Sequence, residues 1–265
     1  MKRLSFGRYL LPVYAALAFL YLLTPIAYTF AFSFNDAGRS NLVWRGFTFT
    51  NWQNPCGAPA VCESVVNSLQ IGVLATVIST VLGTMIAIAL VRYRFRLRAG
   101  ANLLLFLPMA TPEVVLGAAL LAQFLNLRVN PGFATIVIAH VMFCISFVVV
   151  TVKARVASLD PRLEEAAADL YASPRAAFWR VTFPLLLPGI AAAALLAFSL
   201  SFDDFIITNF NSGNTDTFPK FVYVSATRGI PAQANVMGSA MFLIALIIVV
   251  TGQVLAARRR RAAAT

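Results

Sequence analysis

Charged side chains are scarce in this chain of 265 residues. Asp, Glu, Lys and Arg together make up 12% of the sequence, whereas 60% of it is hydrophobic. A soluble globular protein is about one-quarter charged, so the apolar surface here exceeds what a soluble core would bury. The scarcity excludes an ordinary soluble domain, and we predict an all-α protein embedded in a membrane.

Several other features are missing. The phosphate-binding sequence Gly-x-x-x-x-Gly-Lys-Ser/Thr does not occur, so we predict that the chain is not itself an ATPase or another enzyme. No small-residue cleavage site follows the first apolar run, and we expect that run to be a retained helix. His140 is the only histidine. We expect it to pack between helices with one hydrogen bond; a proton relay is the alternative, and a metal site lacks a partner ligand.

Six apolar runs are long enough to cross a bilayer, which takes about 20 residues per helix. Pro108 and Pro112 interrupt the third run, and prolines at such positions kink or break a helix. The predicted spans are residues 10–34, 65–91, 101–127, 133–152, 185–208 and 236–256.

The 21 basic residues are unevenly distributed. Most of them precede the first run, follow the sixth, or join the second run to the third and the fourth to the fifth. Because Lys and Arg collect on the cytoplasmic side of membrane proteins, both termini are predicted to be cytoplasmic. We expect a short N-terminal segment at 1–9, one transmembrane domain at 10–257 and a basic tail at 258–265. The tail is interpreted as a lipid-headgroup anchor, with RNA binding as the alternative.

The chain has only three cysteines. Cys144 lies within an apolar run, where we expect a small packing residue. Cys56 and Cys62 share a polar loop on the predicted outer side. A disulfide between them and two free thiols both stay open, because spacing alone does not decide between these states.

The connection between the fourth and fifth runs, residues 153–184, carries signals for two short helices. Asp160 is a suitable N-cap and Pro161 a suitable first residue, and Ser173 with Pro174 repeats this start. A helix this short is marginal alone in water, so we expect a partner surface to cover its apolar side. That side is the stripe formed by Leu163, Ala166, Ala167 and Leu170.

The same connection resembles the Glu-Ala-Ala signature of the permease subunits of type I ABC importers. Glu165 begins the match, and Val181 and Pro184 end it in register. The resemblance implies six transmembrane helices in the permease fold and a cytoplasmic loop, at about 160–184, that docks on a separate ATPase. The docking residues that it implies are Glu164, Glu165, Ala166, Ala167, Asp169, Leu170, Tyr171, Ser173 and Pro184.

Tyr171 departs from this signature, because the family has glycine at the same position. Glycine turns the chain out of the first helix with a positive φ at little cost, whereas for tyrosine that conformation costs about 1 kcal/mol or more. We therefore expect the first helix to end differently from the family pattern, with Ser173 and Pro174 making the turn.

Three acidic residues are predicted at membrane depth: Glu113, and Asp203 with Asp204 in the outer half of the fifth span. Ionisable groups at that depth are functional candidates because their burial is expensive. The sequence places no basic residue beside them, so we predict a pathway for a cation. Hydrated positions at the outer interface are the alternative. Phe202 and Phe205 would offer ring faces to a cation, or would simply pack.

Segments 112–117, 140–152 and 198–210 resemble the second permease subunit of spermidine/putrescine importers. The resemblance implies polyamine uptake across the inner membrane of a bacterium. The implied partners are a homologous permease, two ATPase subunits that use ATP and Mg, and an extracytoplasmic binding protein, with no cofactor, metal or nucleic acid bound by this chain. The alternatives are an ABC importer for ferric iron, sulfate or thiamine, and a stand-alone secondary transporter.

Overall fold

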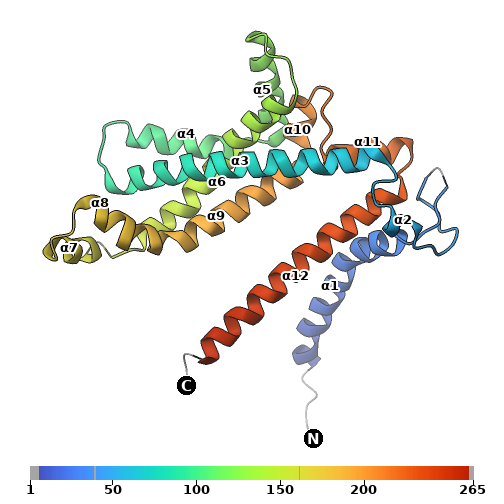
Figure 1. Cartoon of the computed structure of the whole chain (residues 1–265), viewed down its shortest axis with the longest axis horizontal. Coiled ribbons are helices and arrows are strands. Elements are labelled where there is room, and N and C mark those ends of the chain that lie inside the picture. Colours follow the sequence, from blue (N-terminus) through green and yellow to red (C-terminus); the bar gives the residue numbers. More distant parts are fainter. Residues whose placement is uncertain (1–5, 39, 161, 263–265) are drawn as a thin grey trace, which may run out of the picture. The chain divides into compact units, whose positions relative to one another are not determined.

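A computed structural model describes residues 6–38, 40–160 and 162–262 of the chain (Figure 1). Pro161, the predicted first residue of a loop helix, lies outside the described residues. Within them, β structure is limited to one antiparallel bridge between Asn35 and Phe47. The helices are α1 Phe6–Phe32, α2 Thr50–Gln53, α3 Pro59–Arg92, α4 Arg98–Ala110, α5 Glu113–Asn126, α6 Phe133–Ala157, α7 Arg162–Asp169, α8 Pro174–Ala177, the π-helical η1 Phe178–Thr182, α9 Phe183–Asp203, α10 Ile206–Asn211, α11 Phe218–Arg228 and α12 Ala232–Ala262.

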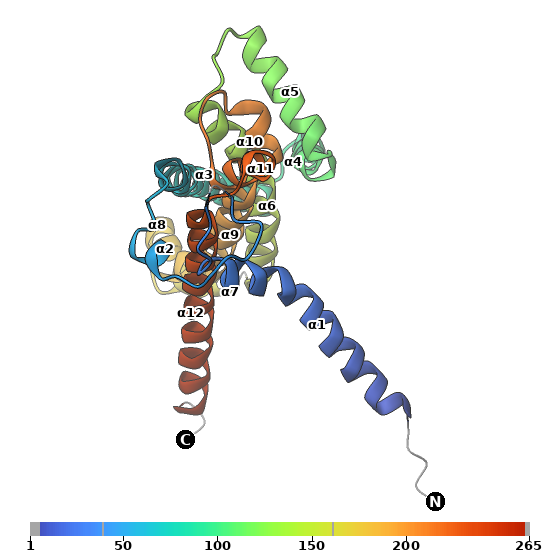
Figure 2. The ribbon, with the colours of Figure 1, turned by 90° about the vertical axis from the view of Figure 1, so that its right-hand side faces the viewer.

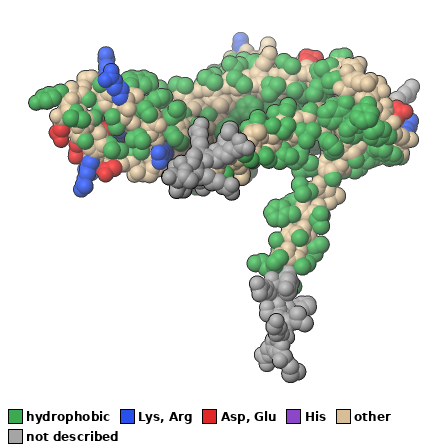
Figure 3. All heavy atoms as spheres, turned by 60° about the horizontal axis from the view of Figure 1, so that its bottom comes forward, with side chains coloured by type: hydrophobic (Ala, Val, Ile, Leu, Met, Phe, Trp, Pro, Cys, Tyr) green, Lys and Arg blue, Asp and Glu red, His purple; other side chains and the backbone are tan. Residues whose placement is uncertain are grey.

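The predicted all-α membrane fold is confirmed. Five helical segments in the described residues are long and apolar enough to cross a membrane, and the bent pair of α4 and α5 makes up to six. In the space-filling view, hydrophobic side chains cover most of the visible surface, and charged side chains gather mainly at the end that carries α7 and α8 (Figure 3). An apolar exterior of this kind requires lipid or partner subunits to cover it.

The chain divides into two compact units, residues 1–62 with 221–265 and residues 63–220. The prediction of one domain over 10–257 stays a prediction. In the first unit, α1 packs along α12, and α2 also contacts α12. The loop after α1 is held by Asn35, whose side-chain amide donates to Asn41 Oδ1 at 2.6 Å and to the Val43 carbonyl at 2.8 Å.

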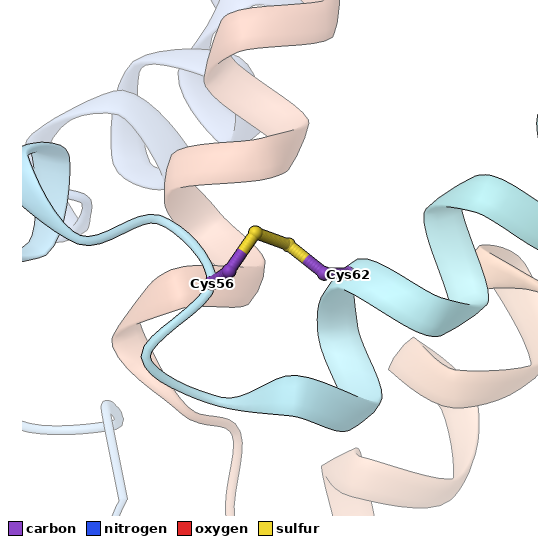
Figure 4. The surroundings of a disulfide bond; sticks show 2 residues. All are labelled: Cys56 and Cys62. Atoms are coloured by element: carbon purple, nitrogen blue, oxygen red, sulfur yellow. A yellow bond between two sulfur atoms is a disulfide. The ribbon is translucent and has the colours of Figure 1, made fainter.

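Cys56 and Cys62 form a disulfide in the first unit, which settles the question left open by the sequence. Figure 4 shows the bond joining the loop after α2 to the beginning of α3. Cys144 is a free thiol buried on α6, as the sequence predicts. Because the two cysteines are close in sequence, the disulfide constrains the backbone only around the start of α3.

The core of the second unit is built around α6, which packs against α9 and α4 (Figure 1). Gly83 of α3 permits close approach to α6, because a Cβ there would lie 2.6 Å from Val148 Cγ1. Gly117 acts similarly between α5 and α10, where a Cβ would lie 2.9 Å from Phe210 Cδ2. The buried residues of α6 include Ile136, Ala139, His140, Phe143, Cys144, Val148, Val149 and Val152.

The third predicted span is broken into α4 and α5 (Figure 2). The chain bends by 109° between these two helices. Thr111 has an extended backbone with ψ 133°, as steric contact with a following proline favours, and Pro112 is extended too. Pro108 instead lies inside α4. The break therefore falls at Thr111–Pro112, and it makes Glu113 the first residue of α5.

The helix found for the fifth predicted span differs from the prediction at both ends. The second loop helix, α8, is not a separate element, because it continues through η1 into α9. In η1 the Phe183 amide donates to the Phe178 carbonyl, a wider turn that accommodates Pro184, which has no N–H to donate. At the other end α9 stops at Asp203, so Asp204 lies in a break before α10 and not within a helix as predicted.

The end of α7 corrects the expectation for Tyr171. This residue adopts a left-handed conformation with φ 58°. The Tyr171 amide donates to the Ala168 carbonyl, and the Ala172 amide to the Ala167 carbonyl, which is the hydrogen-bond pattern of a Schellman turn. The helix therefore ends as a glycine-capped helix does, because its hydrogen bonds outweigh a strain of about 1 kcal/mol. Ser173 then caps α8 by accepting from the Ala176 amide.

Replacing Tyr171 with glycine should stabilise the end of α7 by about 1 kcal/mol, since the left-handed strain is relieved. The Tyr171 side chain is 99% exposed and loses little contact on removal. Hydrogen exchange of the peptide that covers 162–172 should slow by about fivefold in Tyr171→Gly. The control Ala172→Gly should not slow this exchange. Equal exchange rates in wild type and Tyr171→Gly would show that the left-handed conformation of Tyr171 does not strain the helix end.

Candidate functional site

A cavity of about 410 Å³ lies in the second unit where the broken helices meet. Its walls come from the beginning of α5, the middle of α6 and the end of α9 with the break that follows. The lining residues are Glu113, Phe143, Ser199, Leu200, Asp203, Asp204, Phe205 and Ile206. The structure thus brings together all three acidic residues that the sequence singles out.

Contacts of α10 with α5 and α6 fix the side of the cavity that α5 forms. The Asn211 side-chain amide donates to the Gly117 carbonyl of α5 at 3.2 Å, and Thr135 Oγ1 of α6 donates to the Asn211 carbonyl at 2.7 Å. Glu113, at the first position of α5, and Asp203, at the last position of α9, have exposed side chains. Two carboxylates therefore reach the cavity from helix ends, and the α10 contacts fix the α5 end.

Asp204 differs from the other two acids. Its side chain is only 4% exposed, and its oxygens accept hydrogen bonds from the backbone amides of Thr208 at 2.7 Å and Ile207 at 3.3 Å. Short acidic side chains that bind nearby amides in this way favour a break or a cap over a continuing helix. Asp204 therefore lines the cavity and also supplies the hydrogen bonds that begin α10.

His140 lies against Asp204, so the expectation of acids without a basic neighbour is wrong for this residue. Its Nε2 is 3.2 Å from Asp204 Oδ2 and 3.0 Å from Thr208 Oγ1, and its Nδ1 is 2.7 Å from Ser201 Oγ. The expectation of one hydrogen bond is also wrong. Sequence reasoning missed this cluster, although a lone histidine in an apolar run needs buried polar partners.

The two predicted phenylalanines lie differently. Phe205 lines the cavity, together with Phe143 of α6. Phe202 stacks on Phe198, one turn earlier on α9, with ring centroids 5.7 Å apart. Of the predicted pair, Phe205 lines the cavity and Phe202 does not.

The loop formed by α7, α8 and η1 presents exposed apolar side chains. Leu170 is 81% exposed, and Leu163, Tyr171 and Trp179 are also exposed, whereas Ala167 is buried within the chain. The predicted stripe is therefore largely uncovered in the described chain. The other docking residues predicted on this loop are exposed as well: Glu165, Ala166, Asp169, Ser173 and Pro184.

Glu164, a predicted docking residue, instead joins parts of this chain. Its carboxylate accepts hydrogen bonds from Arg92 at the end of α3 and from Thr182 of η1. Partial burial alone would raise the pKa of the Glu164 carboxyl, but the bonds from Thr182 and Arg92 and the Arg92 charge hold that pKa below its ordinary value. Beside this contact lies a cavity of about 500 Å³, lined by residues of α3, α6, α7, η1 and α9.

Apolar helices broken around an acidic cavity, with an exposed amphipathic loop, define a membrane-embedded solute permease. The family model described as "Binding-protein-dependent transport system inner membrane component" matches residues 79–261. The chain belongs to this family, the permease subunits of ABC importers, and is an integral inner-membrane protein.

Two curated relatives match most of the chain. "Spermidine/putrescine transport system permease protein PotC" of Haemophilus influenzae is 32% identical over 238 residues, which cover 89% of this chain and 92% of the relative. "Putrescine transport system permease protein PotI" of Escherichia coli K12 is 35% identical over 232 residues, which cover 84% and 82%. The two alignments thus span more than four-fifths of both relatives.

Solved structures support the fold. The crystal structure of a bacterial ABC transporter involved in the import of alginate matches with a TM-score of 0.67 and 20% identity, covering 94% of this chain and 97% of that one. The MetNI methionine ABC transporter in an inward-facing form matches with a TM-score of 0.56 and 14% identity, covering 73% and 91%. The predicted ABC importer permease fold is confirmed.

Breaking the Arg92–Glu164 contact should loosen the loop. Both side chains are about one-third exposed (32% and 36%), so we expect a loss of less than about 1 kcal/mol in Glu164→Gln. Hydrogen exchange over 162–182 should rise by up to about fivefold, while the neighbouring Glu165→Gln leaves it unchanged. The double variant Arg92→Glu with Glu164→Arg, which swaps the two charges, should recover most of the wild-type protection against hydrogen exchange.

Acid should have the same effect as Glu164→Gln. The pKa of Glu164 is lower in the folded state than in the unfolded chain. The stability that its carboxylate contributes is therefore fully present above the ordinary glutamate pKa of about 4.3, and it is lost as the pH falls through the lowered pKa. Wild type and Glu164→Gln should therefore converge only in strong acid. No recovery in the charge-exchanged pair, or convergence already near neutral pH, would contradict the role of the contact.

Proposed function

We propose that this permease moves polyamines such as spermidine and putrescine into the cytoplasm. The observation that carries the proposal is the cavity at the helix breaks, which gathers the carboxyl groups of Glu113, Asp203 and Asp204 in one place. Curated relatives at 32% and 35% identity bear the names of spermidine/putrescine and putrescine permeases.

The chemistry of the cavity suits a flexible cation. Opposite charges attract far more strongly near a low-dielectric wall than in bulk water, by about fourfold for an effective dielectric constant of 20. Glu113 and Asp203 supply exposed carboxylates, and the rings of Phe143 and Phe205 can face ammonium groups. The same charges repel anions, so an anionic cargo such as sulfate is disfavoured.

The energy would come from a separate ATPase that binds ATP and Mg, and this chain would not be an enzyme. We place the docking surface on the exposed residues of α7 and the turn after it, with Glu165 and Asp169 as charged contacts and Leu170 and Tyr171 as apolar ones. The assembly would contain a homologous permease, two ATPase subunits and an extracytoplasmic binding protein. Both termini and the loop would face the cytoplasm, as the distribution of Lys and Arg indicates.

Removing the carboxylates should weaken polyamine transport. In proteoliposomes with the assembled importer, Asp203→Asn and Glu113→Gln should each raise the KM for spermidine by about tenfold, as loss of one charge contact in a partly desolvated site does. Glu63→Gln is the control, because Glu63 is an exposed acid on α3 outside this cavity. Unchanged KM in both cavity variants would refute a cation pathway.

Reversing a charge on α7 should weaken the ATPase complex. We expect Glu165→Lys to reduce co-purification of the ATPase subunit by at least about tenfold, because the change reverses a charge within the proposed docking surface. Glu63→Lys is the control, with the same change of charge on α3. Full retention of the ATPase by Glu165→Lys would place the docking contact elsewhere.

A further inference from the structure

His140 connects three parts of the second unit through one side chain. It lies on α6, its Nδ1 contacts Ser201 of α9, and its Nε2 contacts Asp204 in the break and Thr208 of α10. The side chains of His140 and Asp204 are only 1% and 4% exposed. The imidazole therefore bridges the two helices on either side of the break.

These contacts satisfy a buried carboxylate. A buried charge without partners strongly destabilises the folded state. If Ser201 donates to Nδ1, then Nε2–H points toward Asp204 and Thr208, so a neutral ring has both nitrogens paired. The two amides of α10 complete the shell around Asp204. With these donors in place, Asp204 can stay turned into the protein.

The direction of Asp204 constrains its neighbour. Successive residues at a helix end point about 100° apart, so a chain that turns Asp204 inward must turn Asp203 elsewhere. Asp203 is exposed and lines the cavity with Glu113. Asp204 also borders the cavity, but its carboxylate is engaged by His140 and the amides of α10, whereas the Asp203 side chain is exposed.

We propose that His140 is a positioning residue, which holds Asp204 as the cap of α10 and thereby directs the Asp203 carboxylate into the cavity to bind the cationic substrate. The inference rests on the proposed polyamine function for the substrate only. The placement of Asp203 by His140 is a property of the chain alone.

Ordinary helix packing does not account for these contacts. Ser146 lies on the same helix, is equally buried, and its hydroxyl has no hydrogen-bond partner in the described structure. α6 therefore packs well around a polar group that has no partner. His140 instead directs both ring nitrogens at the α9–α10 break, so Ser146→Ala is a matched control for loss of a buried polar group on α6.

The placement is tested by thiol accessibility in the assembled importer. Cys56 and Cys62 are bonded and Cys144 is buried, so Asp203→Cys adds the reactive thiol. A cationic methanethiosulfonate should label it readily in the wild-type background. Combination with His140→Ala should slow labelling by at least about fivefold, whereas Ser146→Ala should not change it. His140→Gln, whose amide can donate in place of Nε2–H, should restore most of the rate.

Transport kinetics test the consequence for substrate. His140→Ala should raise the KM for spermidine by about tenfold with kcat nearly unchanged, and His140→Gln should recover most of the affinity. The combination of His140→Ala with Asp203→Asn should be little worse than Asp203→Asn alone, because both changes remove the same contact. If His140→Ala does not assemble, Ser201→Ala, which removes one partner of the ring, takes its place in both assays.

The outcomes separate the two proposals. Equal labelling of Asp203→Cys with and without His140 overturns the positioning role, whatever the substrate. If the KM of His140→Ala combined with Asp203→Asn rises by the product of the two single effects, the positioning role is also overturned. The polyamine function is then unaffected. Labelling that depends on His140, with a spermidine KM insensitive to both Asp203→Asn and Glu113→Gln, supports the placement and refutes the polyamine pathway.

Discussion

The structure depends on one constraint, that a chain in lipid must satisfy its backbone hydrogen bonds internally wherever a helix stops. Each interruption in the second unit has a local solution. Thr111 donates from its hydroxyl and its amide to the Leu107 carbonyl where α4 ends. The Asp204 carboxylate accepts hydrogen bonds from the backbone amides that begin α10. Before Pro184, the backbone adopts the wider π-helical turn of η1.

These solutions also place the polar groups that a transport pathway requires. A continuous helix would use its amides and carbonyls internally and present only side chains. Breaks at Thr111–Pro112 and at Asp204 put Glu113 and Asp203 at helix ends, beside one cavity. The cavity is thus a consequence of the interruptions, and its acidity follows from the residues that stand next to them.

The sequence predicts the parts of this architecture that follow from apolar length and proline chemistry. The runs around α1, α3, α6 and α12 are found as helices, and Pro112 marks a break because it constrains the residue before it. Ser173 and Pro174 begin α8 as predicted, since capping is a local property. The Cys56–Cys62 bond was undecided because spacing does not fix geometry.

What the sequence did not predict depends on contacts between distant residues. The pairing of His140 with Asp204 joins positions 64 apart, and that of Arg92 with Glu164 joins positions 72 apart. For this reason Asp204 was expected to be free and Glu164 to face a partner. The Tyr171 conformation was misjudged for a different reason, because a local penalty was weighed without the two hydrogen bonds that offset it.

The three cysteines have a consequence in thiol chemistry. Thiol–disulfide exchange requires a thiolate that can reach the bond it attacks, and the free cysteine of this chain is buried within α6. The disulfide is therefore protected from scrambling within its own molecule. A chemical reductant would act on the ring closed by Cys56 and Cys62, whose loop-closure contribution is about 2 kcal/mol. The residues that line the acidic cavity include no cysteine, so the same reductant would leave it unchanged.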